Sequence, residues 1–229
     1  MIARLSVLFL ALAVVAAHAA AQTTPLLSPP AAFDRATIRR GAQWFAQYCL
    51  SCHSVKWIRY DRLTRDLGFS KDAVRQELMF PGGAHFAQGM VPTLSARDAA
   101  AWFGVAPPDL TLEARLRGGA WIYTYLRSFY FDPTRPSGWN NHLFPDAAMP
   151  NVLAPISGIR DAKGRLIQRG RLTPRQVNQV IGAITVWLEY TSDPSKLERE
   201  RLGPYVIGFA LLLSVVAYLM KRAYWREVS

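Results

Sequence analysis

The sequence has 229 residues, 51% of them hydrophobic, which is enough for one well-filled domain of ordinary size. Its formal net charge of +11 raises nucleic-acid binding as a first interpretation. The Lys and Arg residues are scattered along the whole chain, however, and no run of five or more occurs. We therefore exclude the class of nucleic-acid-binding proteins.

Residues 1–21 have the pattern of a secretory signal peptide, although the exact cleavage bond stays open. Arg4 gives a basic start, residues 5–17 are apolar, and small residues follow up to Ala21. The apolar run of about 13 residues is short for a membrane span, which needs roughly 20. We expect cleavage to remove His18, which leaves three histidines: His53, His85 and His142.

Capping and stop signals predict a mostly helical domain with long irregular loops, preceded by an extended Pro-containing segment over residues 22–33. Two glycines, Gly118 and Gly119, fall inside one expected helix and call for a packing or cofactor reason. Residues 161–167 suggest a small hairpin. The expected helices run approximately over Asp34–Ser51, Ser70–Met79, Ser95–Phe103, Leu110–Phe129 and Thr173–Ser192.

Near the C-terminus, residues 204–220 carry no charge, and aromatic residues lie close to both ends, which is typical of a membrane-spanning helix. A buried core helix is the alternative, but it does not explain why Lys221 and Arg222 follow directly. The positive-inside rule places these cations and Arg226 in the cytoplasm. The signal peptide predicts the same orientation. We expect a signal peptide (1–21), an exported domain (22–200), a transmembrane anchor (201–222) and a short cytoplasmic tail (223–229).

The segment Cys49-Leu50-Ser51-Cys52-His53 is typical of covalent haem c attachment. Two thiols three positions apart can bond to both haem vinyl groups, and the adjacent imidazole can bind the iron. A thioredoxin-like redox pair requires a preceding strand, and a zinc site requires two further Cys or His residues at short spacing. Neither is present. The chain has two cysteines, both in this motif, so none is left for a structural disulfide.

The second axial ligand decides between an electron carrier and a haem enzyme or gas sensor with an open sixth position. The candidates are Met79, Met90, Met149, His85 and His142. Met149 lies in a loop that Pro145 and Pro150 would stiffen, whereas Met79 suits a core position on its short helix. Met90, followed closely by Pro92, remains a competitor. The residues alone favour Met149 and leave Met90 open.

Haem propionates need cations or hydroxyl donors, and Arg115, Arg117, Tyr123 and Tyr125 follow the Pro107-Pro108 bend. Arg117 and Tyr123 are six positions apart, so they need not share a helix face. Arg117 lies beside two glycines, where missing side chains would let a large cofactor approach the backbone. We therefore prefer Arg117.

Several segments together resemble the cytochrome c1 family, the haem subunits of the quinol–cytochrome c oxidoreductase (cytochrome bc1) complex. They occur in the family's order from about Asp34 to the C-terminus, and end in a basic-flanked anchor. They are residues 49–53, Phe103-Gly104-Val105-Ala106-Pro107-Pro108-Asp109-Leu110, Arg117-Gly118-Gly119 and Ala148-Met149-Pro150-Asn151.

The resemblance implies a class I c-type cytochrome fold enlarged by loops, with one C-terminal transmembrane helix and one haem c. His53 would be the proximal ligand and Met149 the distal one, which lifts Met149 above Met90. Arg117 would meet a propionate and Tyr123 would lie on the propionate side. Pro107, Pro108 and Phe144 would line the haem pocket.

The resemblance also implies partners and a place in the cell. The chain would join cytochrome b and the Rieske iron–sulfur protein, take electrons from the latter and pass them to a soluble cytochrome c. It would be an electron-transfer subunit without an enzymatic reaction of its own, and its single signal peptide favours a bacterial inner membrane with the haem in the periplasm. A monohaem subunit of another respiratory complex, an oxidase or a dehydrogenase, is the alternative. A purely structural membrane subunit is a weaker one.

One property departs from the well-known members, in which an acidic surface meets a basic cytochrome c. Between residues 22 and 200, 22 Lys and Arg stand against 15 Asp and Glu, an excess of seven positive charges. Because complementary charge mainly sets association rate and partner choice, we expect an acceptor that is neutral or acidic, or that docks through apolar contacts.

Overall fold

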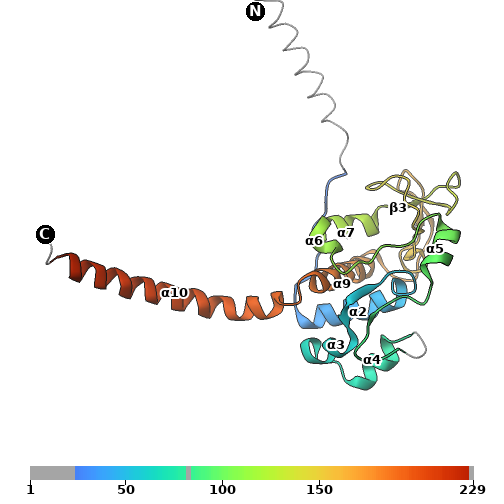
Figure 1. Ribbon diagram of the computed structural model, residues 1–229. Coiled ribbons are helices and arrows are strands. Elements are labelled where there is room, and N and C mark those ends of the chain that lie inside the picture. Colours follow the sequence, from blue (N-terminus) through green and yellow to red (C-terminus); the bar gives the residue numbers. More distant parts are fainter. Residues whose placement is uncertain (1–23, 81–83, 227–229) are drawn as a thin grey trace, which may run out of the picture.

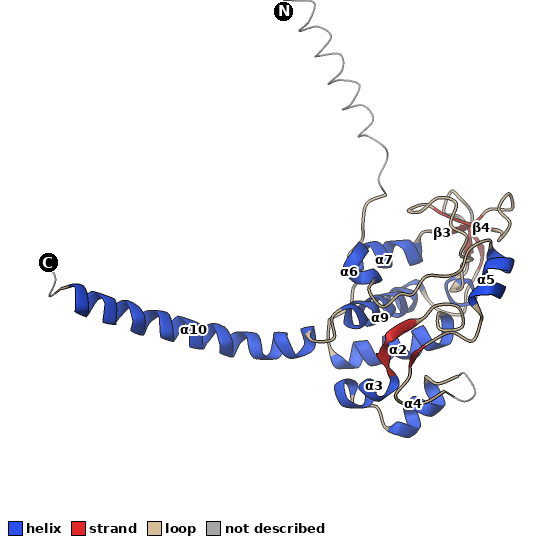
Figure 2. Ribbon diagram, in the orientation of Figure 1, coloured by secondary structure: helices blue, strands red, loops and turns tan. Residues whose placement is uncertain are grey.

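The structure of the chain is a computed structural model that describes residues 24–80 and 84–226. The expected signal peptide (1–21), the Pro81-Gly82-Gly83 segment expected to end the Ser70–Met79 helix, and the last three residues of the expected tail lie outside the described residues. Helices dominate the described part, as predicted (Figure 2). They are α2 (Arg35–Tyr48), α3 (Tyr60–Leu67), α4 (Lys71–Glu77), α5 (Ala96–Phe103), α6 (Glu113–Arg117), α7 (Gly119–Arg127), α8 (Ala154–Ser157), α9 (Pro174–Ser192) and α10 (Lys196–Trp225).

Six short strands form three separate two-stranded antiparallel sheets in the described part. The hairpin expected at 161–167 is confirmed as the β5–β6 pair, whereas the other two pairs and α3 were not predicted from the sequence. The strands are β1 (Val55–Arg59) with β2 (Gly89–Met90), β3 (Phe129–Phe131) with β4 (Trp139–Asn141), and β5 (Ile159–Arg160) with β6 (Leu166–Gln168).

The core forms where α2 crosses α9, at the centre of the globular part in Figure 1. Gly41 of α2 lies directly against α9: a Cβ built there would collide with the backbone carbonyl of Ala183 and lie 2.7 Å from the Cβ of Trp187. Trp187 is fully buried, with its ring centroid 6.2 Å from that of Phe45. The missing side chain at Gly41 therefore sets how closely the two central helices approach.

Four of the predicted helix starts are confirmed, and a side chain caps each of them. The side chains of Asp34, Ser70 and Ser95 each accept a hydrogen bond from a backbone N–H of the first turn. Thr173 forms a complete capping box with Gln176 at the start of α9. The predicted ends of the first two helices, Ser51 and Met79, were each two or three residues too far.

The single helix predicted over Leu110–Phe129 is wrong. The structure has two helices, α6 and α7, separated at Gly118. Gly118 has φ +85° and ψ 152°, a backbone conformation outside the helical region that residues with a Cβ rarely adopt. The two glycines therefore mark a break in the chain direction, and α7 starts a new helical register.

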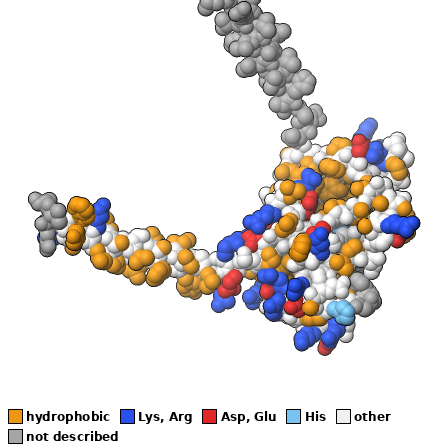
Figure 3. All heavy atoms as spheres, in the orientation of Figure 1, with side chains coloured by type: hydrophobic (Ala, Val, Ile, Leu, Met, Phe, Trp, Pro, Cys, Tyr) orange, Lys and Arg blue, Asp and Glu red, His pale blue; other side chains and the backbone are white. Residues whose placement is uncertain are grey.

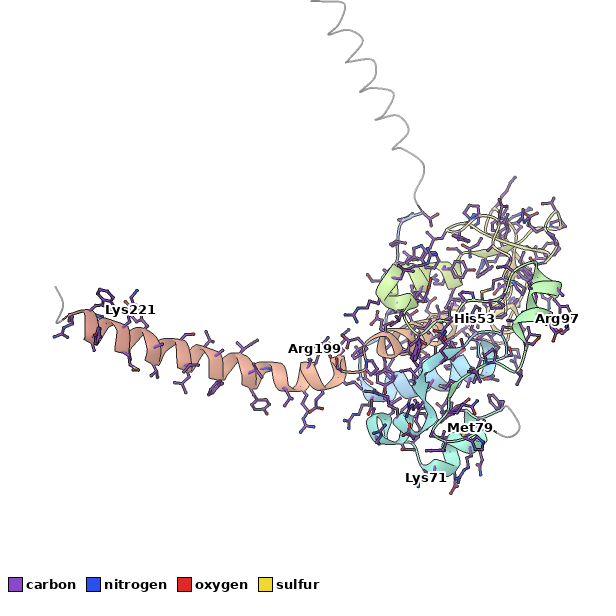
Figure 4. The ribbon with its side chains drawn as sticks, viewed as in Figure 1. His53, Lys71, Met79, Arg97, Arg199 and Lys221 are labelled. Carbon is purple, nitrogen blue, oxygen red and sulfur yellow. The ribbon has the colours of Figure 1, made fainter. Side chains whose placement is uncertain are left out.

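The final helix, α10, continues without interruption from Lys196 to Trp225 and projects away from the globular part (Figure 1). It is the one helix in the described part that is long and apolar enough to cross a membrane. Its hydrophobic side chains are exposed along its length, while charged residues gather where it leaves the domain (Figure 3). Arg199 lies at that junction and Lys221 near the far end (Figure 4).

Candidate haem site

A cavity of about 310 Å³ collects most of the residues that the sequence singled out. Its walls come from the end of α2, the loop before α6, one face of α6 and α7, and the buried face of α9, and they are largely apolar. Eight of the predicted site residues line it: Cys49, Cys52, His53, Pro107, Pro108, Arg117, Phe144 and Met149. The structure thus brings together residues up to 100 positions apart in the chain.

The Cys-Leu-Ser-Cys-His segment forms a tight turn directly after α2. The Cys49 N–H bonds the Phe45 carbonyl at 2.8 Å, and the His53 N–H bonds the Cys49 carbonyl at 2.8 Å. This turn directs both thiols and the imidazole to the same cavity. Burial, with a smaller contribution from Cys52, raises the pKa of Cys49 to about 12, so the thiol is protonated at neutral pH.

The His53 ring is oriented by the loop before α6. Its Nδ1 lies 2.9 Å from the Pro108 carbonyl oxygen, which accepts only, so Nδ1 carries the hydrogen and Nε2 keeps its lone pair. Burial lowers the pKa of His53, against opposing effects of the Pro108 bond and of nearby Glu113 and Asp109. The imidazole is therefore neutral at neutral pH, which is the form that binds a metal.

Asp109 fastens this loop to the chain beyond His53. Its Oδ2 accepts hydrogen bonds from Ser54 Oγ at 2.5 Å and from the Lys56 N–H at 2.9 Å. Its Oδ1 accepts from the Thr111 N–H at 3.1 Å. Burial opposes ionisation, but these bonds together hold the pKa of Asp109 below its usual value. Sequence reasoning assigned Asp109 no role beyond its place in the family segment.

Among the five candidates for a second ligand, Met149 alone lines the cavity. Met90 does not line the cavity: it is fully buried in β2, where it pairs with Val55 of β1. Met79 lies just beyond α4 and packs against the core edge. His85 and His142 do not line the cavity either, so the cavity pairs His53 with Met149.

The loop that carries Met149 is held by two buried amides, Asn140 and Asn141. The Asn141 Oδ1 accepts from the N–H groups of Leu143 and Phe144 at 2.9 and 3.0 Å. The Asn140 Oδ1 accepts from the N–H of Asp146 at 2.9 Å. The two Asn141 contacts span two and three positions, the spacing of an Asx turn, and sequence reasoning missed this local signal.

Arg117 ends α6 at the cavity wall. Its Nε pairs with Glu113 Oε1 at 2.6 Å, and its guanidinium carbon lies 4.3 Å from the centroid of the Trp121 ring. Gly118 and Gly119 do not line the cavity. Gly119 lies instead against α9, where a Cβ built on it would meet the Glu189 carboxylate and the Thr185 side chain.

Tyr123, expected on the propionate side, lies outside the cavity: it is 2% exposed and its hydroxyl accepts a hydrogen bond from Arg127 at 3.2 Å. Trp121 and Tyr125 occupy the cavity wall instead, their rings stacked at 5.0 Å. Sequence reasoning missed Trp121 altogether and gave Tyr125 no preference. The spacing of four between Trp121 and Tyr125 places both on one face of α7 and is the signal that could have found them.

The residues around the cavity fit a c-type haem. Apolar walls, two thiols on one turn, one neutral imidazole and one thioether form the donor set that such a group uses. Within 24–80 and 84–226, no group of three or more His, Cys, Asp or Glu is arranged to hold a metal ion directly. The zinc-site alternative therefore finds no further ligands there.

Known proteins resemble this sequence over most of its length. The sequence profile of the Cytochrome C1 family matches residues 27–80 and 84–228. A cytochrome c1 from Allochromatium vinosum is 43% identical over 210 residues, covering 85% of this chain and 86% of the relative. A protein named ammonia monooxygenase gamma subunit from Nitrosomonas europaea is 35% identical over 218 residues, covering 93% and 92%. A cytochrome c1 from Rhodospirillum rubrum is 30% identical over 228 residues, covering 86% and 84%. The chain belongs to the cytochrome c1 family.

Proposed function

We propose that the chain is a one-electron carrier with a single haem c, attached through Cys49 and Cys52 and ligated by His53 and Met149. Family membership gives it an electron-transfer role in the respiratory chain and implies haem c as the cofactor. The observation that carries the finer assignment is the cavity that unites the Cys-x-x-Cys-His turn with Met149. The haem iron would supply a reversible one-electron couple in this site.

The ligand pair favours a carrier over a haem enzyme or gas sensor. Imidazole and thioether would fill both axial positions, which leaves no coordination site for oxygen or peroxide. Pro107, Pro108 and Phe144 would exclude water from the haem faces, and Arg117 would neutralise a propionate at the cavity edge. The whole domain would be a class I c-type cytochrome fold enlarged by loops.

The membrane arrangement forms part of the proposal. A cleaved signal peptide (1–21) would export residues 22–200 to the periplasm, residues 201–222 would span the inner membrane, and residues 223–229 would stay in the cytoplasm. The exposed apolar surface of α10 supports the span. The cations Lys221, Arg222 and Arg226 at its far end support the orientation.

Within a cytochrome bc1 complex, the chain would lie beside cytochrome b, receive electrons from the Rieske iron–sulfur protein and reduce a soluble cytochrome c. The seven excess positive charges of residues 22–200 favour a neutral or acidic acceptor. For an acidic acceptor, electrostatic attraction predicts reduction rates that fall as ionic strength rises. Rates that rise with ionic strength would contradict it.

A second complex is a specific alternative, because one relative carries the name ammonia monooxygenase gamma subunit. A family member can therefore be named for a complex other than cytochrome bc1. Purification through this chain in mild detergent separates the two. We expect a b-type cytochrome and an iron–sulfur protein to accompany it; other subunits in their place would favour the alternative.

Replacement of the proposed ligand tests the haem assignment. Met149→Leu should abolish the weak absorption near the red edge of the oxidised spectrum and lower the midpoint potential, because the thioether no longer binds the iron. Met90→Leu is the matched control: it changes a fully buried methionine outside the cavity, at nearly constant volume. If Met149→Leu kept the band, or Met90→Leu lost it, the ligand assignment would be wrong.

A further inference from the structure

One residue of α7 contacts Met149 directly. The Tyr125 hydroxyl donates a hydrogen bond to the Met149 sulfur at 3.7 Å, within the range of this weak acceptor. The Tyr125 ring is fixed by neighbours: it stacks on Trp121 at 5.0 Å with an interplanar angle of 9°, and meets the ring edges of Phe129 and Phe144. The hydroxyl therefore projects from a ring with little freedom to turn.

The same residue also holds the base of the Met149 loop. Its backbone carbonyl accepts a hydrogen bond from the Asn141 side-chain amide at 2.9 Å. Asn141 is 1% exposed, and its Oδ1 accepts hydrogen bonds from the N–H groups of Leu143 and Phe144. Tyr125 thus contacts the loop at two places, through its carbonyl near the start and through its hydroxyl at the thioether.

A thioether sulfur has two lone pairs, so one can be given to iron while the other accepts a hydrogen bond. We propose that Tyr125 is the positioning residue for Met149, and that its hydroxyl orients the sulfur and raises the midpoint potential. This inference rests on the proposed His53 and Met149 ligation. The hydrogen bond withdraws electron density from sulfur, and ferric iron depends on that density more than ferrous iron does.

The test is Tyr125→Phe in the full-length haem-loaded protein, since phenylalanine keeps the ring contacts and removes the hydroxyl. We expect a lower midpoint potential, with the red-edge band of the oxidised spectrum retained. Tyr130→Phe is the matched control, because Tyr130 stacks on His142 and does not line the cavity. It should change neither property. Far-ultraviolet circular dichroism and covalent haem content establish that both variants fold.

A double-mutant cycle asks whether Tyr125 acts through the sulfur. Met149→His would place an imidazole on the iron, and its remaining nitrogen is a donor that cannot accept from the Tyr125 hydroxyl. The Tyr125 oxygen can there only accept from the imidazole N–H, so Tyr125→Phe should no longer lower the midpoint potential in the Met149→His protein. An equal shift in both backgrounds, or no shift in the parent protein, would overturn the role of Tyr125.

The failure of the two proposals can be told apart. If the parent protein lacks the red-edge band, or Met149→Leu keeps it, the ligand assignment fails and the inference on Tyr125 falls with it. If the parent shows the band and Met149→Leu loses it, the ligand assignment stands. An unchanged potential in Tyr125→Phe then refutes the positioning role alone.

Discussion

Asp109→Asn is the most direct test of how the His53 loop is held. The carboxylate accepts three hydrogen bonds, from Ser54 and Lys56 on one oxygen and from Thr111 on the other. Asparagine retains one acceptor oxygen and would set its NH2 group against either the Lys56 or the Thr111 N–H. Losing a bond to a charged group costs about 1.5–3 kcal/mol, so we expect the free energy of unfolding to fall by about 2 kcal/mol.

Guanidinium unfolding followed by far-ultraviolet circular dichroism, on the haem-loaded protein in detergent, measures this loss. With a denaturant slope of about 4 kcal/mol/M, the midpoint should fall by about 0.5 M. Asp72→Asn is the control, since the Asp72 side chain is 81% exposed and its ion pair with Arg75, at 3.4 Å, lies at the surface. Equal guanidinium midpoints for the two variants would show that the Asp109 hydrogen bonds do not stabilise the folded chain.

The pH dependence gives an independent check. The pKa of Asp109 is lowered in the folded protein, so its contribution is fully present above the unfolded value of about 3.9. As the pH falls through the lowered folded pKa, the carboxylate is protonated and the contribution disappears. The difference between the parent and Asp109→Asn should therefore be complete at pH 7 and shrink in acid. A difference that grew below pH 4 would contradict this sign.

Three further substitutions have expected outcomes. Gly41→Ala should lower the free energy of unfolding by at least about 2 kcal/mol in the same denaturation assay, because its Cβ would collide with the Ala183 carbonyl; an unchanged midpoint would contradict the close approach of α2 and α9. Gly118→Ala should cost about 1–3 kcal/mol, since alanine is strained at φ +85°, and a neutral result would argue against the break between α6 and α7. Tyr123→Phe should leave the haem spectrum and midpoint potential unchanged, because its hydroxyl bonds Arg127 outside the cavity; a shifted potential would restore Tyr123 to the propionate side.

The sequence was most informative where the chemistry is local. Caps such as Asp34 and Thr173 bond the N–H group three positions ahead, so residue order alone identifies them. The Cys-x-x-Cys-His turn is equally local, and its side chains indeed share one cavity. The mostly helical character of the chain followed from the same kind of signal.

Long-range contacts account for what was missed. The β1–β2 pair joins Val55 to Met90, and no periodicity in a strand of two residues indicates that partner. For the same reason the residues alone left Met90 and Met149 open, and the family resemblance decided between them. Asp109 bonds Ser54 and Lys56, and Tyr125 bonds Met149 and Asn141; only the folded chain brings these partners near. The double glycine was expected to have a packing or cofactor reason, but the break that Gly118 makes between α6 and α7 was not predicted.

The segment that connects α9 to α10 is very short. Only Asp193, Pro194 and Ser195 separate the two helices, and the Asp193 carboxylate pairs with Arg199 of α10 at 2.6 Å across the turn. Thirty helical residues extend about 45 Å, which exceeds a hydrocarbon core of about 30 Å. Part of α10 would therefore extend beyond the hydrocarbon core as a continuation of the same helix. With the proposed span, the haem domain would be held in place at the membrane, and its redox partners would have to come to it.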